Sequence, residues 1–483
     1  MQALRSSKFT DFLKNISAFK IVFIFNLFLQ SFIFLDAACC VVDALILIWS
    51  LFFLKKAFLK SSRAKTGFVG EKLAIFFIIS CLITAFVHVN VDFPRSILFE
   101  ILMILYYSVC IFIFYGSYES FDKEKFSKET TIVFKLISFF NTVCVFISFV
   151  FILLRKQIVF SGEIIKGEPF RYIAGIYSVT GVQRFTGFYE NPNIAAFCSV
   201  ISLIFLHMLA KKREFFKDFS KWPKRALFLL FAGLNLLALI LSDSLSSLLF
   251  LTIYLVLVLF NRYVSFKYLN TKQKLKNFFI FAINTFLAVC ILMFARQSIQ
   301  ESASNVINNI SLDSSSGNIS NVNFGRLVYR IGDGNGRLEL WAQAIKMFRN
   351  NPILGIGISN INYYSKLYFG SSYGVQFPNF HNGYISILTC YGIFGALIFI
   401  ILLFKITFRL LSVLLKNISG RCLGVFPNIA ACIVAYLVYA VSEKTVLSEI
   451  NIMGVFFWLM LGYAFMFIKF YINEEAPVQS ICV

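Results

Sequence analysis

The chain has little charge, few prolines and only three histidines in 483 residues. Charged residues make up 14% and hydrophobic residues 59% of the sequence. Soluble domains carry about a quarter charged residues, so this composition indicates a membrane protein. The net charge of +21 would suit a nucleic-acid-binding protein, but the basic residues are concentrated in short segments between apolar runs. That distribution follows the positive-inside rule, and nucleic acid is therefore not an expected partner.

Two further absences concern metals and disulfides. None of the 11 cysteines forms a CxxC pair, and most lie inside apolar runs, so we expect neither a disulfide framework nor a zinc site. The long polar segments also lack DxD or other acidic clusters. We therefore expect a site with no metal ion and no cofactor.

Long apolar runs are what the chain has in abundance. A spanning helix needs roughly 20 apolar residues. We expect an all-α polytopic membrane protein with about 12 transmembrane helices, in agreement with the runs at 20–35, 37–54, 73–91, 96–116, 132–154, 193–210, 226–241, 245–261, 277–295, 383–404, 425–441 and 451–470.

The charged loops set the orientation of these helices. Four segments are rich in lysine and arginine: 55–72, 211–225, 262–276 and 405–424. With a cytoplasmic N-terminus, all four fall on the cytoplasmic side, as the positive-inside rule requires. Two long segments, 155–192 and 296–382, then lie outside, together with the hairpin tip at 242–244.

This topology predicts three regions. Residues 1–295 form an N-terminal transmembrane bundle of about nine helices, which includes the external loop 155–192. Residues 296–382 form a large external loop that contains short amphipathic helices, after a Ser- and Asn-rich surface excursion from Gln300 to Asn323. Residues 383–483 form the C-terminal transmembrane helices and a short cytoplasmic tail.

The large loop contains one amphipathic helix with an arginine at its start. Leu338, Trp341, Ala342, Ile345 and Phe348 recur at spacings of three and four, which predicts their common face. Arg337 opens the helix, where a cation is unfavourable for the helix dipole but would strengthen the attraction for an anion. The alternative is an interfacial arginine that contacts lipid phosphate.

The other external loop contains VQRFTGFYENPNIAAF at residues 182–197. Asn191-Pro192-Asn193 predicts a turn that starts the next helix, and Arg184 lies just ahead between aromatic residues. The alternative for Arg184 is again an interfacial arginine, here in an aromatic belt.

His381 and Asn382 lie where the large loop meets a transmembrane helix. A single histidine often only packs or forms hydrogen bonds, and that alternative stays open. The topology, however, puts His381 on the same side of the membrane as Arg184 and Arg337. Histidine is also the side chain most often used as a general base at neutral pH.

Three motifs occur in order between Gly336 and Gly395. They are GRLELW, NPILGIG, and HN followed after nine residues by Gly392 and two residues later by Gly395. RFTGFYENPN, at 184–193, precedes them. In this order and spacing they resemble the O-antigen ligase and polymerase superfamily of bacterial envelope glycosyltransferases; the rest of the chain matches only in hydropathy.

The resemblance implies a GT-C-like fold in the bacterial inner (cytoplasmic) membrane, with an active site that faces the periplasm. It implies an undecaprenyl-diphosphate-linked glycan as donor and a glycan or a lipid A core as acceptor. Besides membrane lipids, a chain-length regulator or a flippase is an implied partner.

The resemblance also implies roles for the candidate residues. His381 would act as the general base that deprotonates the acceptor hydroxyl. Arg337 and Arg184 would contact the diphosphate, because arginine offers permanently charged, bidentate contacts to phosphate oxygens. Asn382 would orient the histidine or a sugar, and Trp341 would stack on a sugar.

One position departs from the family pattern. The family usually carries an arginine after a Ser or Thr at the external tip of a mid-chain helix hairpin. Here that stretch reads LILSDSLSSLLF, and the corresponding position is Leu245. We interpret Arg184 as the substitute.

Three activities remain as alternatives. A polymerase joins lipid-linked repeat units, and the missing hairpin arginine favours it. A ligase moves the finished glycan to a lipid A core or to a protein. A transporter or flippase would show ionisable residues arranged within the membrane. Asp43, Glu100 and Lys135 do lie in apolar runs but are scattered, which favours an enzyme.

Overall fold

The structure of the protein is a computed structural model. It describes residues 11–32, 36–61, 68–88, 95–120, 122–154, 159–165, 168–173, 175–179, 182–211, 221–263, 270–310, 324, 337–370, 380–417, 425–445, 447 and 450–472.

Within these ranges, six helices are long and apolar enough to cross a membrane, judged by length and composition. They are Ser96–Tyr118, Lys123–Leu153, Pro192–Ala210, Arg225–Ser242, Gly383–Val413 and Ile452–Phe470. Shorter apolar helices accompany them, at Ile16–Gln30, Leu245–Phe260, Leu275–Ala288 and Phe426–Tyr439. A multi-pass helical membrane protein is confirmed, and the count of 12 spans stays a prediction.

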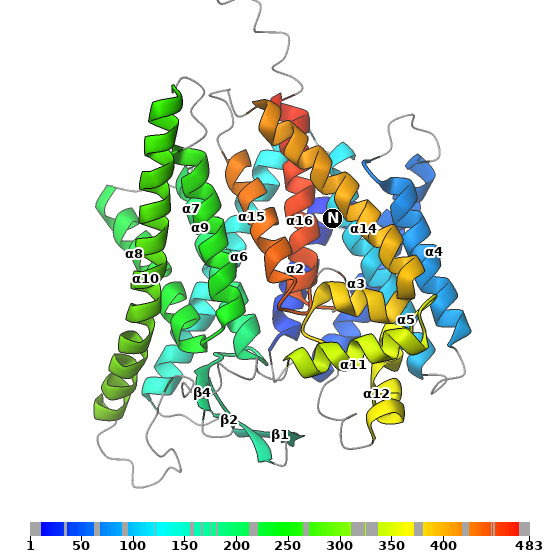
Figure 1. The fold of residues 1–483 in the computed structure, drawn as a ribbon, viewed down its shortest axis with the longest axis horizontal. Coiled ribbons are helices and arrows are strands. Elements are labelled where there is room, and N and C mark those ends of the chain that lie inside the picture. Colours follow the sequence, from blue (N-terminus) through cyan, green and yellow to red (C-terminus); the bar gives the residue numbers. More distant parts are fainter. Residues whose placement is uncertain are drawn as a thin grey trace, which may run out of the picture. The chain divides into compact units, whose positions relative to one another are not determined.

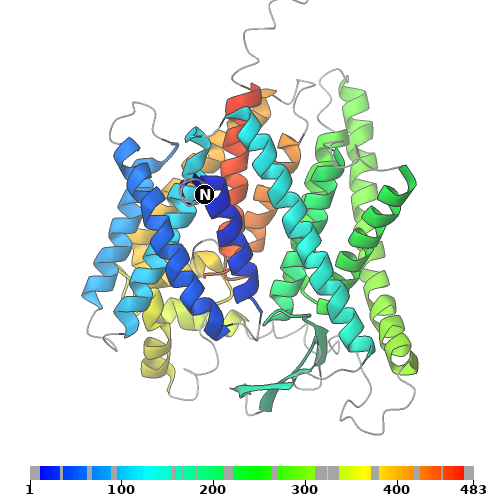
Figure 2. The ribbon, with the colours of Figure 1, turned by 180° about the vertical axis from the view of Figure 1, so that it is seen from behind.

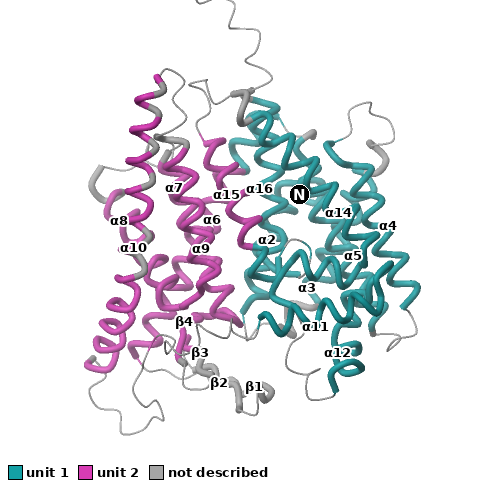
Figure 3. Tube along the Cα trace, viewed as in Figure 1, with its two compact units in different colours: residues 1–129, 334–415, 440–483 teal, residues 130–333, 416–439 magenta. Residues whose placement is uncertain are grey.

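The chain divides into two compact units (Figure 3). Unit 1 comprises Met1–Glu129, Gly334–Leu415 and Ala440–Val483, and unit 2 comprises Thr130–Asp333 and Lys416–Tyr439. Unit 1 thus combines N-terminal and C-terminal helices with the C-terminal part of the large loop. The units cut across the expected regions 1–295, 296–382 and 383–483.

The helices of unit 1 come from both ends of the chain (Figure 1). They are α2 (Ile16–Gln30), α3 (Asp36–Ser61), α4 (Glu71–Val87), α5 (Arg95–Ser108), the π-helix η1 (Val109–Tyr115), η2 (Gly116–Ser120), α11 (Arg337–Asn350), η6 (Ile358–Asn360), α12 (Ile361–Phe369), α14 (Gly383–Asn417), α16 (Ile452–Phe467) and η7 (Ile468–Ile472). Figure 2 shows α2 and α3, in blue, side by side.

α16 forms the core of unit 1. Every residue from Ile452 to Phe467 is buried, which fits a helix that is apolar on all sides. The helix packs on the π-helix η1, which directly follows α5 in the sequence. The residues of η1 are buried as well. A Cβ at Gly462 would lie 2.3 Å from the carbonyl oxygen of Phe114, so only glycine permits this close approach.

α14 is broken at Gly392, whose φ of 63 and ψ of −171 are not helical. The part before the break runs beside α11 in Figure 1, and the longer part after it turns away. The expected span 383–404 is therefore two pieces. Gly392 and the NPILGIG segment, two of the motifs noted in the sequence, meet at this break.

The loop between α11 and η6 supplies the hydrogen bonds that the broken helix lacks. Ile393 N donates to Pro352 O at 2.8 Å, and Phe394 N donates to Ile353 O at 3.3 Å. In the other direction, the amides of residues 356 and 357 donate to the carbonyls of residues 389 and 390, at 3.1 and 2.8 Å. Irregular backbone within a membrane protein is tolerated where such partners satisfy it.

Glycines make this docking possible. Gly355 has a φ of 72, and a Cβ there would lie 2.5 Å from the backbone of Cys390 and Gly392. A Cβ at Gly392 would lie 2.3 Å from Ile353 O. Gly355 of NPILGIG and Gly392, which follows HN after nine residues, therefore have a steric role: two backbone segments meet where no side chain fits.

Unit 2 contains the remaining helices and a small sheet. Its elements are most of α6 (Lys123–Leu153), β1 (Val159–Ile165), β2 (Glu168–Ile173), β3 (Ile176–Val179), β4 (Val182–Phe185), α7 (Pro192–Lys211), α8 (Lys221–Ser242), α9 (Leu245–Tyr263), α10 (Thr271–Ile310) and α15 (Phe426–Tyr439). The strands pair antiparallel in the order β1-β2-β3-β4.

Two features of unit 2 depart from the expectations. The four-stranded sheet was not predicted, because the strands are short and the external loop 155–192 carries only brief alternation of apolar and polar residues. The excursion from Gln300 is helical as far as Ile310, since α10 continues beyond residue 295. Residues 311–323 lie outside the described part of the chain.

The core of unit 2 ties the sheet to the helices. Ile176 and Phe185, from β3 and β4, pack in one buried cluster with Val145 of α6, Leu241 of α8 and Ile307 of α10. Phe185 is completely buried and directly follows Arg184. The packing of its neighbour therefore fixes where the Arg184 backbone lies.

Candidate functional site

His381 lies directly before α14, in a tightly held backbone segment. Its φ is 45, in the left-handed region that residues other than glycine rarely adopt. The next residue, Asn382, is the N-cap of α14, and its Oδ1 accepts a hydrogen bond from Ile385 N at 2.9 Å. On the other side, Trp341 Nε1 donates to Phe380 O at 3.0 Å. Uncommon backbone conformations of this kind concentrate at functional sites.

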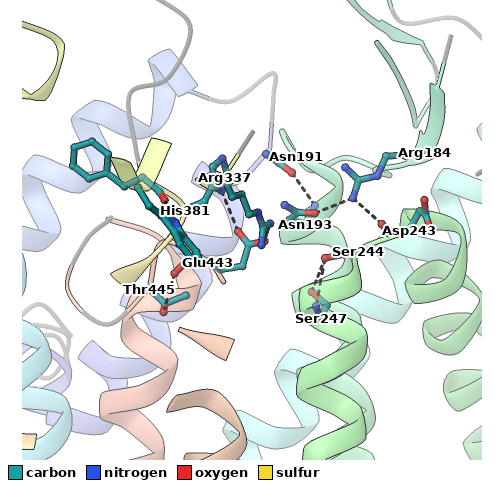
Figure 4. Close-up of polar contacts among 12 residues, drawn as sticks. Arg184, Asn191, Asn193, Asp243, Ser244, Ser247, Arg337, His381, Glu443 and Thr445 are labelled. Atoms are coloured by element: carbon teal, nitrogen blue, oxygen red, sulfur yellow. Dashed lines mark hydrogen bonds and ion pairs between the residues drawn. The ribbon is translucent and has the colours of Figure 1, made fainter. Parts of the chain in front are cut away.

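A carboxylate joins His381 to Arg337 (Figure 4). Glu443 Oε1 is 2.8 Å from Arg337 Nη2, and Glu443 Oε2 is 3.4 Å from His381 Nδ1. The Glu443 side chain is only 3% exposed, whereas those of Arg337 and His381 are 22% and 29% exposed. A buried acid thus holds two partly exposed groups, one on each carboxylate oxygen.

Gly383 explains how Glu443 reaches this position. The turn after α15 passes over the start of α14, and Gly383 N donates to Ala440 O at 2.9 Å. A Cβ at Gly383 would lie 2.6 Å from Thr445 O. Any side chain at Gly383 would push the turn away, so the HNG sequence lets Glu443 approach the histidine that precedes this glycine.

The contact with Glu443 has a consequence for the imidazole of His381. When Nδ1 carries a proton and donates it to the carboxylate, Nε2 is the nitrogen that can accept a proton. A carboxylate at Nδ1 also stabilises the imidazolium that forms when Nε2 takes a proton. This arrangement can perform general base catalysis.

Arg337 begins α11, and the predicted helix is confirmed with a different buried face. Its buried residues are Leu340, Gln343, Ala344 and Met347. On the common apolar face that the spacing predicts, Leu338 is 66% exposed and Ala342 is exposed too. These residues are buried because α11 packs against the first part of α14. At this contact Ala344 is completely buried, and Thr389 Oγ1 donates to Ala344 O at 3.2 Å.

Arg184 lies at the tip of the α8–α9 hairpin in unit 2. Its Nε donates to Ser242 O at 2.8 Å, and its Nη2 donates to Asp243 O at 3.3 Å and to Asn193 Oδ1 at 2.8 Å. The Asn191 side chain caps the start of α7 by accepting from Asn193 N at 2.8 Å. The guanidinium is therefore held at the hairpin tip, where the family pattern would place its arginine at Leu245.

A second arginine lies at this tip and was not among the predicted site residues. Arg296, on α10, forms an ion pair with Asp243, whose side chain is completely buried. Gln300 Nε2 donates to the same Asp243 oxygen at 3.2 Å and to Ile240 O at 2.9 Å. Asp243 itself has a φ of 52, so the tip has a left-handed backbone.

Four predicted site residues belong to unit 1: Arg337, Trp341, His381 and Asn382. Arg337 and His381 meet at Glu443, which the sequence analysis missed. The sequence feature that could have indicated Glu443 is its position as an acidic residue in the short turn between two apolar runs. Arg184 belongs to unit 2. In the described ranges, no group of three or more His, Cys, Asp or Glu side chains could hold a metal ion.

Part of the chain matches a known protein family. Residues 226–400 match the family model described as O-antigen ligase. The resemblance to the O-antigen ligase and polymerase superfamily is thereby confirmed. The match covers Asp243, Arg296, Arg337 and His381 but ends before Glu443 and begins after Arg184. No curated protein matches the chain. The match supports a membrane enzyme that processes O-antigen.

Proposed function

We propose that the protein is a membrane glycosyltransferase that polymerises O-antigen or capsular polysaccharide repeat units. The donor is an oligosaccharide on undecaprenyl diphosphate, and the reaction occurs at the periplasmic face of the bacterial inner membrane. One observation carries the proposal: a buried carboxylate, Glu443, contacts both the candidate base His381 and the candidate diphosphate ligand Arg337.

The proposed reaction is a direct displacement. The acceptor hydroxyl oxygen attacks the anomeric carbon of the donor sugar, and its proton passes to Nε2 of His381. The bond between the anomeric carbon and the diphosphate oxygen breaks, and the diphosphate leaves with the electron pair. This course inverts the anomeric configuration and needs no metal ion.

The charged residues fit the demands of this step. Negative charge develops on the diphosphate, and arginine can stabilise it through paired, charge-assisted hydrogen bonds. We assign that role to Arg337, which lies with His381 in unit 1; for Arg184, in unit 2, the role stays what the family resemblance implies. The proton adds a positive charge to His381, and Glu443 compensates it at the opposite ring nitrogen. Base catalysis of this kind is typically worth about 10²-fold to 10⁴-fold.

A ligase reaction is the second candidate, because the matching family model is described as O-antigen ligase. The chemistry at His381 and Arg337 would be the same, and only the acceptor would differ. The glycan would pass to a lipid A core or to a protein instead of another repeat unit.

His381→Ala tests the proposed function. Membranes supplied with lipid-diphosphate-linked repeat units from the producing strain should lose transfer, with an unchanged amount of protein. The matched control is His207→Gln, which alters a histidine of unit 2 that contacts Tyr254 at 2.7 Å. Full transfer by His381→Ala would end the role of general base.

A glycan ladder on a gel separates the candidates. Loss of a polymerase leaves single repeats on the core, whereas loss of a ligase leaves the core without glycan. Uptake of lipid-linked glycan into vesicles without any acceptor would instead indicate a flippase.

A further inference from the structure

Glu100 is a buried carboxylate that the proposed mechanism does not use. It lies on α5 in unit 1 and is 1% exposed. Its neighbours are not basic residues but two segments that meet at the break in α14. In the sequence it is one of several scattered ionisable residues within apolar runs.

The contacts of Glu100 join the first part of α14 to the segment that docks into the break. Its Oε2 accepts hydrogen bonds from Ser359 N at 3.0 Å and from Ser359 Oγ at 2.9 Å. Its Oε1 accepts one from Tyr391 OH at 3.1 Å. Ser359 lies in η6, directly after the loop that docks into the break, and Tyr391 is the last residue before Gly392. One carboxylate therefore holds the loop and the first part of α14 together.

Other side chains of the N-terminal helices hold the same loop. Thr84 Oγ1 donates to Leu354 O at 2.8 Å, and His88 Nε2 lies 2.8 Å from Gly355 O. His88 Nδ1 lies 3.0 Å from Tyr364 OH on α12. The loop is thus fixed between α4 and α5 on one side and α14 on the other, with Glu100 as its charged contact.

The break determines where the reactive groups lie. α11 leads into the loop, and the first part of α14 ends at the break, so both segments share this anchor. From it they run beside each other to the end where Arg337 and His381 meet Glu443. A change in the angle at the break would move His381 relative to Arg337. A misplacement of about 1 Å can cost about 10²-fold in rate.

We propose that Glu100 is a positioning residue for the transfer reaction, acting by locking the broken helix that carries His381. The inference rests on the proposed function. Glu100 does not contact the reacting groups, so it acts on the turnover step through geometry. The carboxylate matters as an acceptor of several hydrogen bonds, and glutamine preserves part of that capacity.

Three variants test the inference with lipid-diphosphate-linked repeat units isolated from the producing strain. Glu100→Ala should lower kcat about 10-fold to 100-fold and leave the KM for the donor within about threefold, because the donor contacts are intact. Glu100→Gln should recover most of this loss. The amount of protein in the membrane and its thermal midpoint in detergent are measured alongside.

A matched tyrosine pair keeps the test valid if Glu100→Ala fails to accumulate. Tyr391→Phe removes a hydroxyl that binds Glu100, whereas Tyr107→Phe removes a buried hydroxyl whose described hydrogen bond, at 3.3 Å, is with Tyr391 OH. Only Tyr391→Phe should lower kcat, by about threefold to tenfold, the effect of about one hydrogen bond.

The outcomes separate the two proposals. Wild-type kcat in Glu100→Ala, or equal losses in Tyr391→Phe and Tyr107→Phe, would overturn the positioning role while transfer by the wild-type protein stands. A loss confined to the thermal midpoint, with unchanged kcat, would also overturn it. Absence of transfer by the wild-type protein would overturn the proposed function and this inference with it.

Discussion

Each unit contains a buried carboxylate beside arginines, but the two carboxylates serve different groups. In unit 1, Glu443 contacts Arg337 through one oxygen and His381 through the other. In unit 2, the Asp243 side chain binds Arg296 and Gln300, and its backbone carbonyl binds Arg184. Thus the candidate arginine of unit 1 is held by a side-chain charge, and that of unit 2 is held in part by backbone oxygens.

This difference shows how the same residue type can be positioned by different means. Arg337 depends on the identity of residue 443, because a carboxylate is its partner. Arg184 depends on the conformation of the hairpin tip, where Asp243 has a left-handed backbone. Loss of the carboxylate should therefore be severe in unit 1 and mild in unit 2.

The largest effect is expected for Glu443→Ala. It removes the partner of Arg337 and His381 together, so the imidazole loses both its orientation and its compensating charge. Transfer should fall by about 10²-fold to 10⁴-fold, comparable to the loss of the base itself. The measurement is initial transfer rate per amount of membrane protein. Glu339→Ala, which changes an exposed acid on α11, is the control and should keep wild-type activity.

A smaller effect is expected for Arg184→Lys. Lysine keeps the charge but cannot bridge Ser242 O and Asn193 Oδ1 as the planar guanidinium does. Transfer should fall about 10-fold to 100-fold, the equivalent of about one charge-assisted hydrogen bond. Arg349→Lys, at an exposed arginine of α11, serves as the control. Wild-type rates in Arg184→Lys would remove Arg184 from the diphosphate site.

The smallest effect is expected for Asp243→Asn. Asparagine tolerates the left-handed backbone, so the carbonyl that binds Arg184 should keep its place. The ion pair with Arg296 is lost, and transfer should fall only about fivefold, the effect of about 1 kcal/mol. The measurement is the initial transfer rate of Asp243→Asn, compared with that of Glu443→Gln. A larger loss in Asp243→Asn than in Glu443→Gln would show that the two carboxylates do not differ in the way proposed here.

Much of the helical fold was predictable because apolar runs of sufficient length have few alternatives in a membrane protein. The α8–α9 hairpin and α11 follow from local patterns of this kind. The break in α14 was not predictable, because residues 383–404 are apolar on both sides of Gly392. The buried residues of α11 were not predictable, since its packing partner and not its own periodicity selects them.

The sequence by itself determined that this is a helical membrane protein, and its motifs pointed to the O-antigen ligase superfamily and to His381 and Arg337. Only the tertiary structure decided that Glu443 joins these two residues, that Arg296 pairs with the carboxylate of Asp243, and that Glu100 joins the first part of α14 to the segment docked at its break. Glu443 is 62 residues from His381 and 106 from Arg337. Local spacing cannot reveal such pairs, because they arise only where separate helices pack together.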